Sequence, residues 1–364
     1  TVTVTSKSLQ PAVVNERVSR IVVNNDTVQE FFGVKPGGPS TRTVDLRTGA
    51  YDIFDDSREV AEASRPGAPA TDITRQAVGR VFYSVPRSSE KVSLLYEAMN
   101  QQRVIGGQSQ DMSGAVFTSE QERIIRQRQS NMREFQLAAM CRGSYTYTRT
   151  GDRLTHGFSG GAETVNFQIP AGNLNQLDML GDGDIITNSW ATASTNILDD
   201  CWEVDDALVE LTGRGLAHIF LNSSTWRYIP GNTQVQNEAG SSNTPFETLQ
   251  SDPQRGLHTA TLAGLPGVTW HINNNRVALA GTQTKLFGAN KVTFMTEMDS
   301  TIVRYMECGE PVAEWEGRPK TMRYGEYYWA RELVDPDRVE IHGLSNGLPE
   351  LLVPKAIATG DVTS

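Results

Sequence analysis

The chain has 364 residues, of which 38% are hydrophobic and 21% charged, values typical of a folded, loop-rich protein with more than one packed core. Its formal net charge is −10, which disfavours tight nucleic-acid binding, because that binding needs clustered Lys and Arg to neutralise phosphates. The sequence contains no apolar run of about 18 residues that would span a membrane, and residues 1–10 lack the apolar stretch of a secretory signal. The three cysteines (Cys141, Cys201 and Cys308) are widely spaced, so we expect reduced thiols rather than a Cys-x-x-Cys metal or redox centre.

Residues 1–43 are predicted to form an extended N-terminal arm. Thr1–Thr5 alternates like a strand edge, no sustained period follows it, and the Pro/Gly run at 36–39 forbids regular structure. An arm of this length gains little by packing on its own subunit, so we expect a neighbouring molecule to order it.

Residues 44–85 are predicted to form a long β-hairpin. Val44 and Leu46 alternate with polar residues on one side, and Val81, Tyr83 and Val85 do so on the other. The centre of the excursion is charged and contains Asp52, Asp55, Asp56, Arg58, Glu59, Glu62 and Arg65. Such a ribbon cannot form a core alone, so it is mobile, folds back on its own subunit or lies on another molecule.

A long helix is predicted from about residue 119 to 142. Ser119–Glu122 matches a capping box, and Gly143 supplies the stop. The apolar stripe is thin, which predicts that one face rests on a sheet while the rest is solvated. Acidic residues are interspersed with the arginines of the helix, so a solvated face is favoured over a membrane or nucleic-acid surface. These arginines are Arg123, Arg126, Arg128 and Arg133.

The remainder predicts a compact α/β unit at 196–304, inserted in a β-rich frame at 86–195 and 305–364. Alternation at 145–147 and 165–169 predicts a β-hairpin, and apolar residues from Ile197 to Leu211 recur at helical spacing before Gly213. Thr244-Pro245 predicts the start of a further helix. Residues 216–221, 268–272, 292–295, 327–329 and 339–341 are predicted strands.

A catalytic reading rests on Gly157-x-Ser159-x-Gly161, which matches the nucleophile elbow of a serine hydrolase. His258, His271 and His342 follow it, but a polar stretch precedes the motif and an alternating strand follows, so a hairpin turn explains the glycines better. The acidic group Asp178, Asp182 and Asp184 lacks the further oxygen ligands that calcium needs. We therefore expect no catalytic residue, no metal and no cofactor, with a serine hydrolase as the alternative.

Several short segments in the same order resemble the lambda-type major capsid (E) family of tailed bacteriophages. The segments are 123–125 with 131–134, 143–146, 222–226, 243–249, 288–290 and 350–352. The resemblance implies an α+β protein with the Hong Kong ninety-seven-type phage capsid fold. Its parts would be an N-arm at 1–43, an extended β-hairpin loop at 44–85, a β-rich peripheral domain at 86–195 and 305–364, and an α/β axial domain at 196–304. The spine helix, at about 119–142, would belong to the peripheral domain.

The resemblance further implies a major head protein that is not an enzyme and that self-assembles into hexamers and pentamers of an icosahedral shell around double-stranded DNA. Expected partners are other copies, a scaffolding protein, a portal and a decoration protein, with only weak nonspecific contact to packaged DNA and none to a membrane. The expected location is the virion, and the host cytoplasm during assembly. The loop residues named above are the expected inter-subunit contacts, because the resemblance places the loop across the adjacent subunit, where it would pair with arginines of that subunit. The arginines Arg123, Arg126, Arg128 and Arg133 belong to the expected spine helix. Some proteins with this fold join neighbouring subunits by an isopeptide bond between a Lys of the extended loop and an Asn. No Lys occurs between Lys35 and Lys91, so the loop of this chain lacks the nucleophile for such a bond. We therefore expect the shell to be reinforced by noncovalent contacts. Another virion or tail structural protein is a second alternative.

Overall fold

The computed structural model describes residues 11–23, 26–36, 38–54, 79–95, 114–150, 153–157, 163–175, 177–238, 246–252, 256–279, 281–313, 320–334 and 337–363. The chain forms two compact units. Unit 1 contains residues 1–49, 84–137 and 305–349, and unit 2 contains residues 50–83, 138–304 and 350–364. The predicted domain ranges follow other boundaries and stay a prediction.

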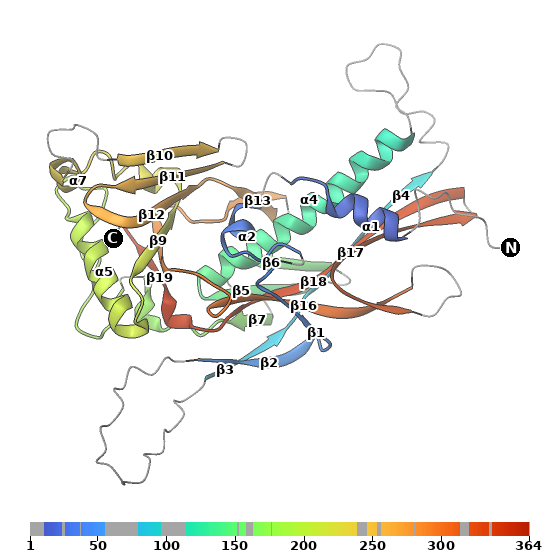
Figure 1. The fold of residues 1–364 in the computed structure, drawn as a ribbon, viewed down its shortest axis with the longest axis horizontal. Helices are drawn as coiled ribbons and strands as arrows, with labels where there is room; N and C mark the ends of the chain where they lie inside the picture. Colours follow the sequence, from blue (N-terminus) through green and yellow to red (C-terminus); the bar gives the residue numbers. More distant parts are fainter. Residues whose placement is uncertain are drawn as a thin grey trace, which may run out of the picture. The chain divides into compact units, whose positions relative to one another are not determined.

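Unit 1 is built on a five-stranded sheet with the order β1-β16-β17-β18-β4 (Figure 1). The strands are β1 (Thr41–Val44), β16 (Val303–Val312), β17 (Thr321–Val334), β18 (Asp337–Leu351) and β4 (Arg87–Leu95). β1 pairs with β16 in parallel, and β17, β18 and β4 pair antiparallel. Val44 therefore belongs to this sheet, and the prediction that it opens the long hairpin is wrong.

The long helix α4 (Gly114–Cys141) and the short helix α1 (Pro11–Ser19) cover one face of this sheet. Val14 and Val18 of α1 pack with Ile125 of α4 against Tyr328 and Ile341 of the strands. The expectation that a neighbour orders the arm is therefore wrong for α1, because its apolar side chains are buried on its own unit. A further short helix, α2 (Thr27–Phe31), follows in the arm.

The start and surroundings of α4 differ from the prediction. The helix begins at Gly114, so Ser119 lies inside it and does not cap it. A Ser-x-x-Glu pattern also fits a helix interior, where Ser costs little. The helix ends at Cys141 and Gly143 has φ 89°, as predicted for its stop. Residues 132–141 are all buried, so the expectation of one buried face is wrong for the second half of the helix.

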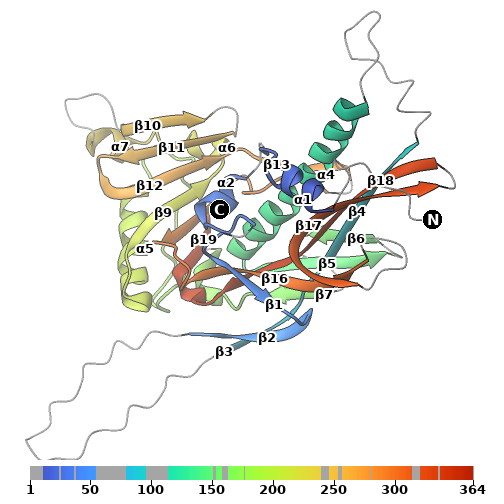
Figure 2. The ribbon, with the colours of Figure 1, turned by 45° about the vertical axis from the view of Figure 1, so that its right-hand side comes forward.

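Unit 2 contains a seven-stranded sheet with the order β10-β11-β12-β9-β15-β19-β8 (Figures 1 and 2). The strands are β10 (Phe246–Asp252), β11 (Leu257–Leu262), β12 (Leu265–Asn273), β9 (Leu216–Leu221), β15 (Lys291–Thr296), β19 (Ile357–Asp361) and β8 (Leu174–Asn175). Helix α5 (Ile197–Thr212) packs on the sheet with α6 (Ser223–Trp226) and α7 (Thr233–Glu238) nearby. Gly213 caps α5 with φ 75°, which confirms the predicted helix and its stop.

Two predictions about this unit are wrong. Thr244-Pro245 itself lies outside the described residues, but the helix predicted to follow it is wrong, because Phe246–Asp252 forms strand β10, paired antiparallel with β11. The local signal of a proline at a first helical turn is overridden by this ladder and by the strand preference of Phe and Thr. The last strand, β19, is expected in the β-rich frame that includes residues 305–364, but it lies in this sheet beside β15.

Smaller elements complete the chain. A three-stranded sheet has the order β6-β5-β7, formed by β6 (Arg153–Gly157), β5 (Ser144–Thr150) and β7 (Glu163–Asn166). The two-stranded ribbons are β13 (Arg276–Leu279) with β14 (Thr282–Lys285) and β2 (Thr48–Ile53) with β3 (Gly79–Ser84). Short 3-10 helices occur at Ala171–Asn173 and Pro354–Ala356. In the described parts of the chain, no helix is long and apolar enough to cross a membrane.

Candidate functional site

The ribbon β2–β3 is the described base of the predicted extended loop. Tyr51 and Tyr83 stack with ring centroids 6.3 Å apart, and Val81 is 1% exposed, so one face of the ribbon is buried. The Leu351 N–H donates to the Tyr51 hydroxyl at 3.2 Å, and the Phe54 N–H donates to the Leu352 carbonyl at 2.8 Å. Burial raises the pKa of Tyr51, so the hydroxyl stays protonated. The ribbon base is thus fixed to residues 351–352, which belong to one of the short segments that carry the family resemblance.

The opposite face of the ribbon is exposed. Phe82 is 76% exposed and Phe54 is 55% exposed. Asp52 forms an ion pair with Arg80 at 2.9 Å, so this predicted contact residue has a partner within its own ribbon. The other predicted loop contacts, Asp55, Asp56, Arg58, Glu59, Glu62 and Arg65, lie outside the described residues.

The four arginines of α4 divide into an exposed pair and a buried pair. Arg123 is exposed, and Arg128 is 65% exposed and pairs with Glu90 at 2.9 Å. Arg126 forms an ion pair with Glu326 and donates to the Tyr328 hydroxyl at 3.3 Å. The prediction that the arginines of this helix form a solvated face is therefore wrong for Arg126 and Arg133, which are buried.

Arg133 is the more deeply buried of that pair, at 1% exposure. It lies 3.4 Å from Glu307 and 3.3 Å from Glu326, and it donates to the Val34 carbonyl at 2.7 Å. Its guanidinium also lies 4.2 Å from the Tyr305 ring centroid. The arginine therefore joins the helix to the sheet and to the arm.

Glu134, the next residue, holds the start of α2. Its carboxylate accepts from the backbone N–H of Val28 at 3.1 Å and of Gln29 at 2.8 Å. Burial raises the pKa of Glu134 to about 7, although these hydrogen bonds oppose the shift. Sequence reasoning missed this contact, because the partners are about a hundred positions apart.

Two segments that carried the family resemblance meet in unit 2. Asn222 accepts from the N–H groups of Ser224 and Thr225 at 2.9 and 3.1 Å and donates to the Phe287 carbonyl at 3.1 Å. Asn290, with φ 60°, donates its N–H to the Thr225 hydroxyl at 3.1 Å. These hydrogen bonds hold segments 222–226 and 287–290 together, so we assign their polar residues a structural role rather than a catalytic one.

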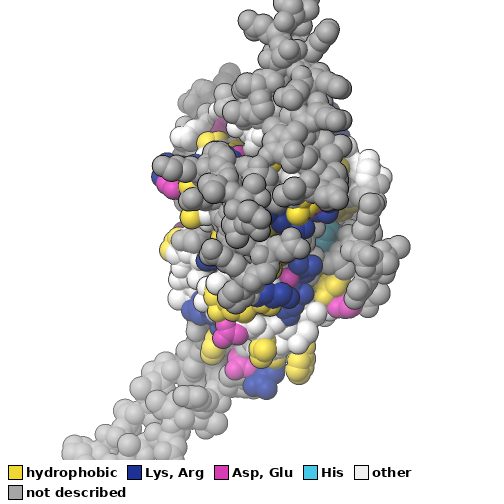
Figure 3. Space-filling model, turned by 90° about the vertical axis from the view of Figure 1, so that its right-hand side faces the viewer, with side chains coloured by type: hydrophobic (Ala, Val, Ile, Leu, Met, Phe, Trp, Pro, Cys, Tyr) yellow, Lys and Arg dark blue, Asp and Glu magenta, His cyan; other side chains and the backbone are white. Residues whose placement is uncertain are grey.

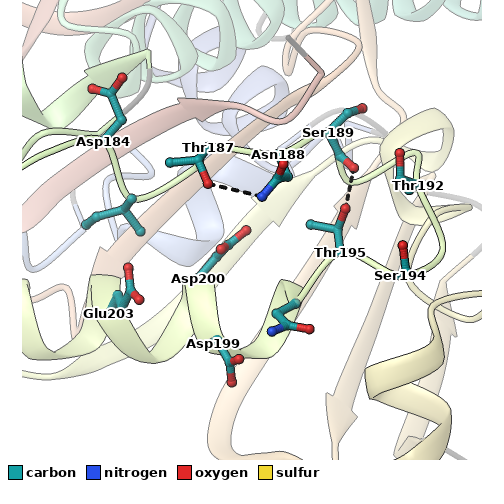
Figure 4. A pocket seen from close by; sticks show the side chains of 12 residues that line it. Asp184, Thr187, Asn188, Ser189, Thr192, Ser194, Thr195, Asp199, Asp200 and Glu203 are labelled. Carbon is teal, nitrogen blue, oxygen red and sulfur yellow. Dashed lines mark hydrogen bonds between the residues drawn. The ribbon is translucent and has the colours of Figure 1, made fainter.

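A polar pocket of about 570 Å³ lies beside the start of α5 (Figure 4). Its lining includes Asp184, Asp199, Asp200 and Glu203 with several hydroxyl groups, but no His or Cys. Burial raises the pKa of Asp200 to about 7, while a hydrogen bond from the Trp190 indole at 2.7 Å opposes the shift. A nucleophile with an adjacent imidazole is therefore missing from this pocket.

The residues of the hydrolase alternative are not assembled in the described parts of the chain. Ser159 lies outside the described residues. His271 lies 3.2 Å from His218, and His342 lies 3.2 Å from Glu340, so each is engaged elsewhere. Among the described residues, no group of three His, Cys, Asp or Glu is arranged to hold a metal ion.

Comparisons with known proteins agree with this geometry. A putative capsid protein of an Escherichia coli CFT073 prophage is structurally similar, with a TM-score of 0.56 and 11% identity, covering 98% of this chain and 99% of that one. A phage-related protein from Bordetella bronchiseptica RB50 gives a TM-score of 0.55 at 12% identity, covering 97% of both chains. These neighbours show the fold, which is that of phage capsid proteins of the Hong Kong ninety-seven type.

No curated protein sequence matches the chain significantly. The model of one family, described as phage major capsid protein E, matches residues 16–362. That match covers almost the whole chain, including both units and the ribbon. The chain therefore belongs to the phage major capsid protein E family.

Proposed function

We propose that the chain assembles with copies of itself into hexamers and pentamers, which close into an icosahedral shell around a packaged double-stranded DNA genome. The observation that carries the proposal is the family membership over residues 16–362. A major capsid protein is a structural protein of the virion shell and not an enzyme. We place its assembly in the host cytoplasm.

The extended loop is the proposed contact between neighbouring subunits. The contact residues would be Asp52, Asp55, Asp56, Arg58, Glu59, Glu62 and Arg65. The exposed aromatic face of the ribbon base supports this role, because removing the apolar side chains of Phe54 and Phe82 from water by contact with a neighbour lowers the free energy. Isolated surface ion pairs contribute only about 0–1 kcal/mol each, so the charges matter as a network repeated around a ring.

The helix arginines contribute unequally to such a contact. Arg126 and Arg133 have partners inside unit 1, whereas Arg123 and Arg128 are exposed. Of these four, the exposed pair are the ones we propose to face a neighbour.

The predicted ranges 1–43, 44–85, 86–195 with 305–364, and 196–304 serve as arm, loop, peripheral domain and axial domain in this proposal, with the axial domain at the ring centre. A scaffolding protein, a portal and a decoration protein are the proposed partners. Contact with packaged DNA is weak and nonspecific, consistent with the net charge of −10. Reinforcement is noncovalent, because no Lys lies between Lys35 and Lys91.

Negative-stain electron microscopy of the purified chain at high concentration, with size-exclusion chromatography of the same sample, tests the proposal. Closed shells, or rings that convert to shells, are expected. The experiment is repeated with the candidate scaffolding protein, since shell formation can require it. A chain that stays monomeric under both conditions would refute the assembly proposal.

A further inference from the structure

Glu340 of β18 lies at the centre of a group of basic side chains on the five-stranded sheet. Its carboxylate is 3.1 Å from Lys91 Nζ, 3.1 Å from Arg338 Nη2 and 2.8 Å from Arg331 Nη2. His342 Nε2 lies 3.2 Å away. We call these five residues the Glu340 cluster.

The Glu340 cluster carries an excess of positive charge. Burial raises the pKa of Glu340, but hydrogen bonds from Arg331 and Lys91 outweigh it and lower the pKa to about 2. Burial and the charge of Arg331 lower the pKa of His342, which keeps the imidazole neutral at physiological pH. Three cations around one carboxylate leave a net charge of +2.

The cations of this cluster remain accessible although Glu340 is 0% exposed. The side chains of Lys91, Arg331 and Arg338 are 54%, 37% and 29% exposed. Each keeps N–H donors beyond those that Glu340 uses. The carboxylate therefore orders the cations while leaving them able to bind a second anion.

A second basic group lies on the same face of the sheet. Glu310 of β16 pairs with Arg87 at 2.7 Å and with Arg47, and it accepts from the Asn346 amide at 2.9 Å. Two cations and one carboxylate leave a net charge of +1. We call Glu310, Arg47 and Arg87 the Glu310 cluster.

Strand β4 links the two clusters. In the antiparallel ladder between β4 and β18, Arg87 lies opposite Asn346 and Lys91 lies opposite His342. Because the two cations are an even number of residues apart on β4, their side chains point to the same face of the sheet. They are four residues apart on a strand, which corresponds to about 13 Å. Ser89 and Ser93 complete an exposed row on β4, which is an edge strand of the sheet.

The combined charge of the two clusters is +3 in a chain whose net charge is −10. Figure 3 looks onto the end of unit 1 toward which β17 and β18 extend in Figure 1, and it shows Lys and Arg side chains close together there. Like charges held around one carboxylate repel each other, so an added anion is favoured. A nucleic acid is a less favourable source of this anion than an acidic protein segment, because the net negative charge of the rest of the chain repels its phosphates.

We propose that the Glu340 and Glu310 clusters together bind the acidic segment Asp55–Glu62 of a second copy of this chain. This segment contains four carboxylates and one arginine, Arg58, so its formal charge of −3 matches the +3 of the two clusters. Asp55 and Glu59 are four residues apart, and in an extended segment this spacing is the same as that of Arg87 and Lys91. The inference rests on the proposed function, because each copy in a ring would supply both the segment and the basic surface.

Zero-length carbodiimide cross-linking tests the contact directly. Particles are assembled from an equal mixture of nitrogen-15-labelled and unlabelled chain, treated with the reagent and analysed by peptide mass spectrometry. The expected product joins Lys91 to a carboxylate of segment 55–62, with mixed-isotope pairs that prove a contact between copies. The control Lys91→Arg keeps the charge, and it should assemble normally while losing this product.

A charge variant tests whether the contact drives assembly. Ser89→Glu introduces a negative charge in the exposed row without removing any ion pair of the clusters, and it should lower the yield of particles at least tenfold. Gln283→Glu, at an exposed position of unit 2, is the matched control and should assemble like the parent. Adding Asp55→Arg to Ser89→Glu should restore part of the yield.

The outcomes separate this inference from the proposed function. If the parent chain forms no particles even with its scaffolding protein, the proposed function fails and the inference falls with it. If the parent forms particles but Lys91 yields no link to segment 55–62 of another copy, only the inference is overturned. Unchanged particle yield with reduced retention of packaged DNA in Ser89→Glu would also overturn it, in favour of nucleic-acid phosphates.

Discussion

Replacing Arg133 by Met tests whether the buried charges on α4 hold unit 1 together. The guanidinium contacts Glu307, Glu326 and the Val34 carbonyl, and the side chain is 1% exposed. Methionine fills most of the volume but cannot donate, so the two carboxylates lose a shared partner. We therefore expect the substitution to lower the free energy of unfolding.

The magnitude depends on what remains after the change. Glu326 keeps its ion pair with Arg126, whereas Glu307, 8% exposed, is left without this cation. Removing one member of a buried pair costs about 3–5 kcal/mol, and because Glu326 remains paired we expect a loss near the lower end, about 3 kcal/mol.

Urea unfolding followed by far-ultraviolet circular dichroism measures this loss, with the slope m compared between variants. The control is Arg123→Met, an exposed position on the same helix, which should change the unfolding free energy by less than about 0.5 kcal/mol. A loss below about 1 kcal/mol for Arg133→Met at unchanged m would show that the desolvation cost of the charges cancels their attraction, and it would refute the reasoning.

Four further outcomes are expected. Because the folded-state pKa of Glu134 is raised to about 7, the parent should lose up to about 3 kcal/mol of stability relative to Glu134→Gln as the pH rises from about 4.5 to 7; a constant difference in urea titrations over that range would contradict this. Because the folded-state pKa of Glu340 is lowered to about 2, the stability advantage of the parent over Glu340→Gln should be present above pH ~4.5 and disappear as the pH falls toward 2, as measured by thermal unfolding. Phe294→Ala should cost about 3–5 kcal/mol in denaturant unfolding, since Phe294 is fully buried and packs edge-on against Trp190. Purified shells boiled in dodecyl sulfate should run as a monomer of 40.0 kDa, and a covalent ladder would refute noncovalent reinforcement.

The elements that the sequence predicted correctly are those whose period is visible over a few turns or strand residues. Apolar residues from Ile197 to Leu211 have helical spacing, and Val268, Trp270 and Ile272 alternate, because α5 and β12 each bury one side against the same core. The order of short family-like segments also predicted the family and the fold, since that order is a property of the chain alone.

The errors occurred where a local signal competed with a distant partner. Thr244-Pro245 resembles a helix start, yet the residues after it pair with β11. The stripe on α4 predicted one buried face, yet Arg133 and Glu134 are enclosed by the arm and the sheet, from residues 28–34 and 307–326. No spacing along the helix reveals these contacts.

The sequence by itself determined the fold class, the family and the presence of an acidic loop without a lysine. Only the tertiary structure decided which charges are satisfied internally and which remain exposed. Lys91 and Arg331 are 240 positions apart, and both reach Glu340 because β4 and β17 each pair with β18. Strand register places side chains from distant parts of the chain on one face, and this register is set by the packing of the whole sheet rather than by any local pattern.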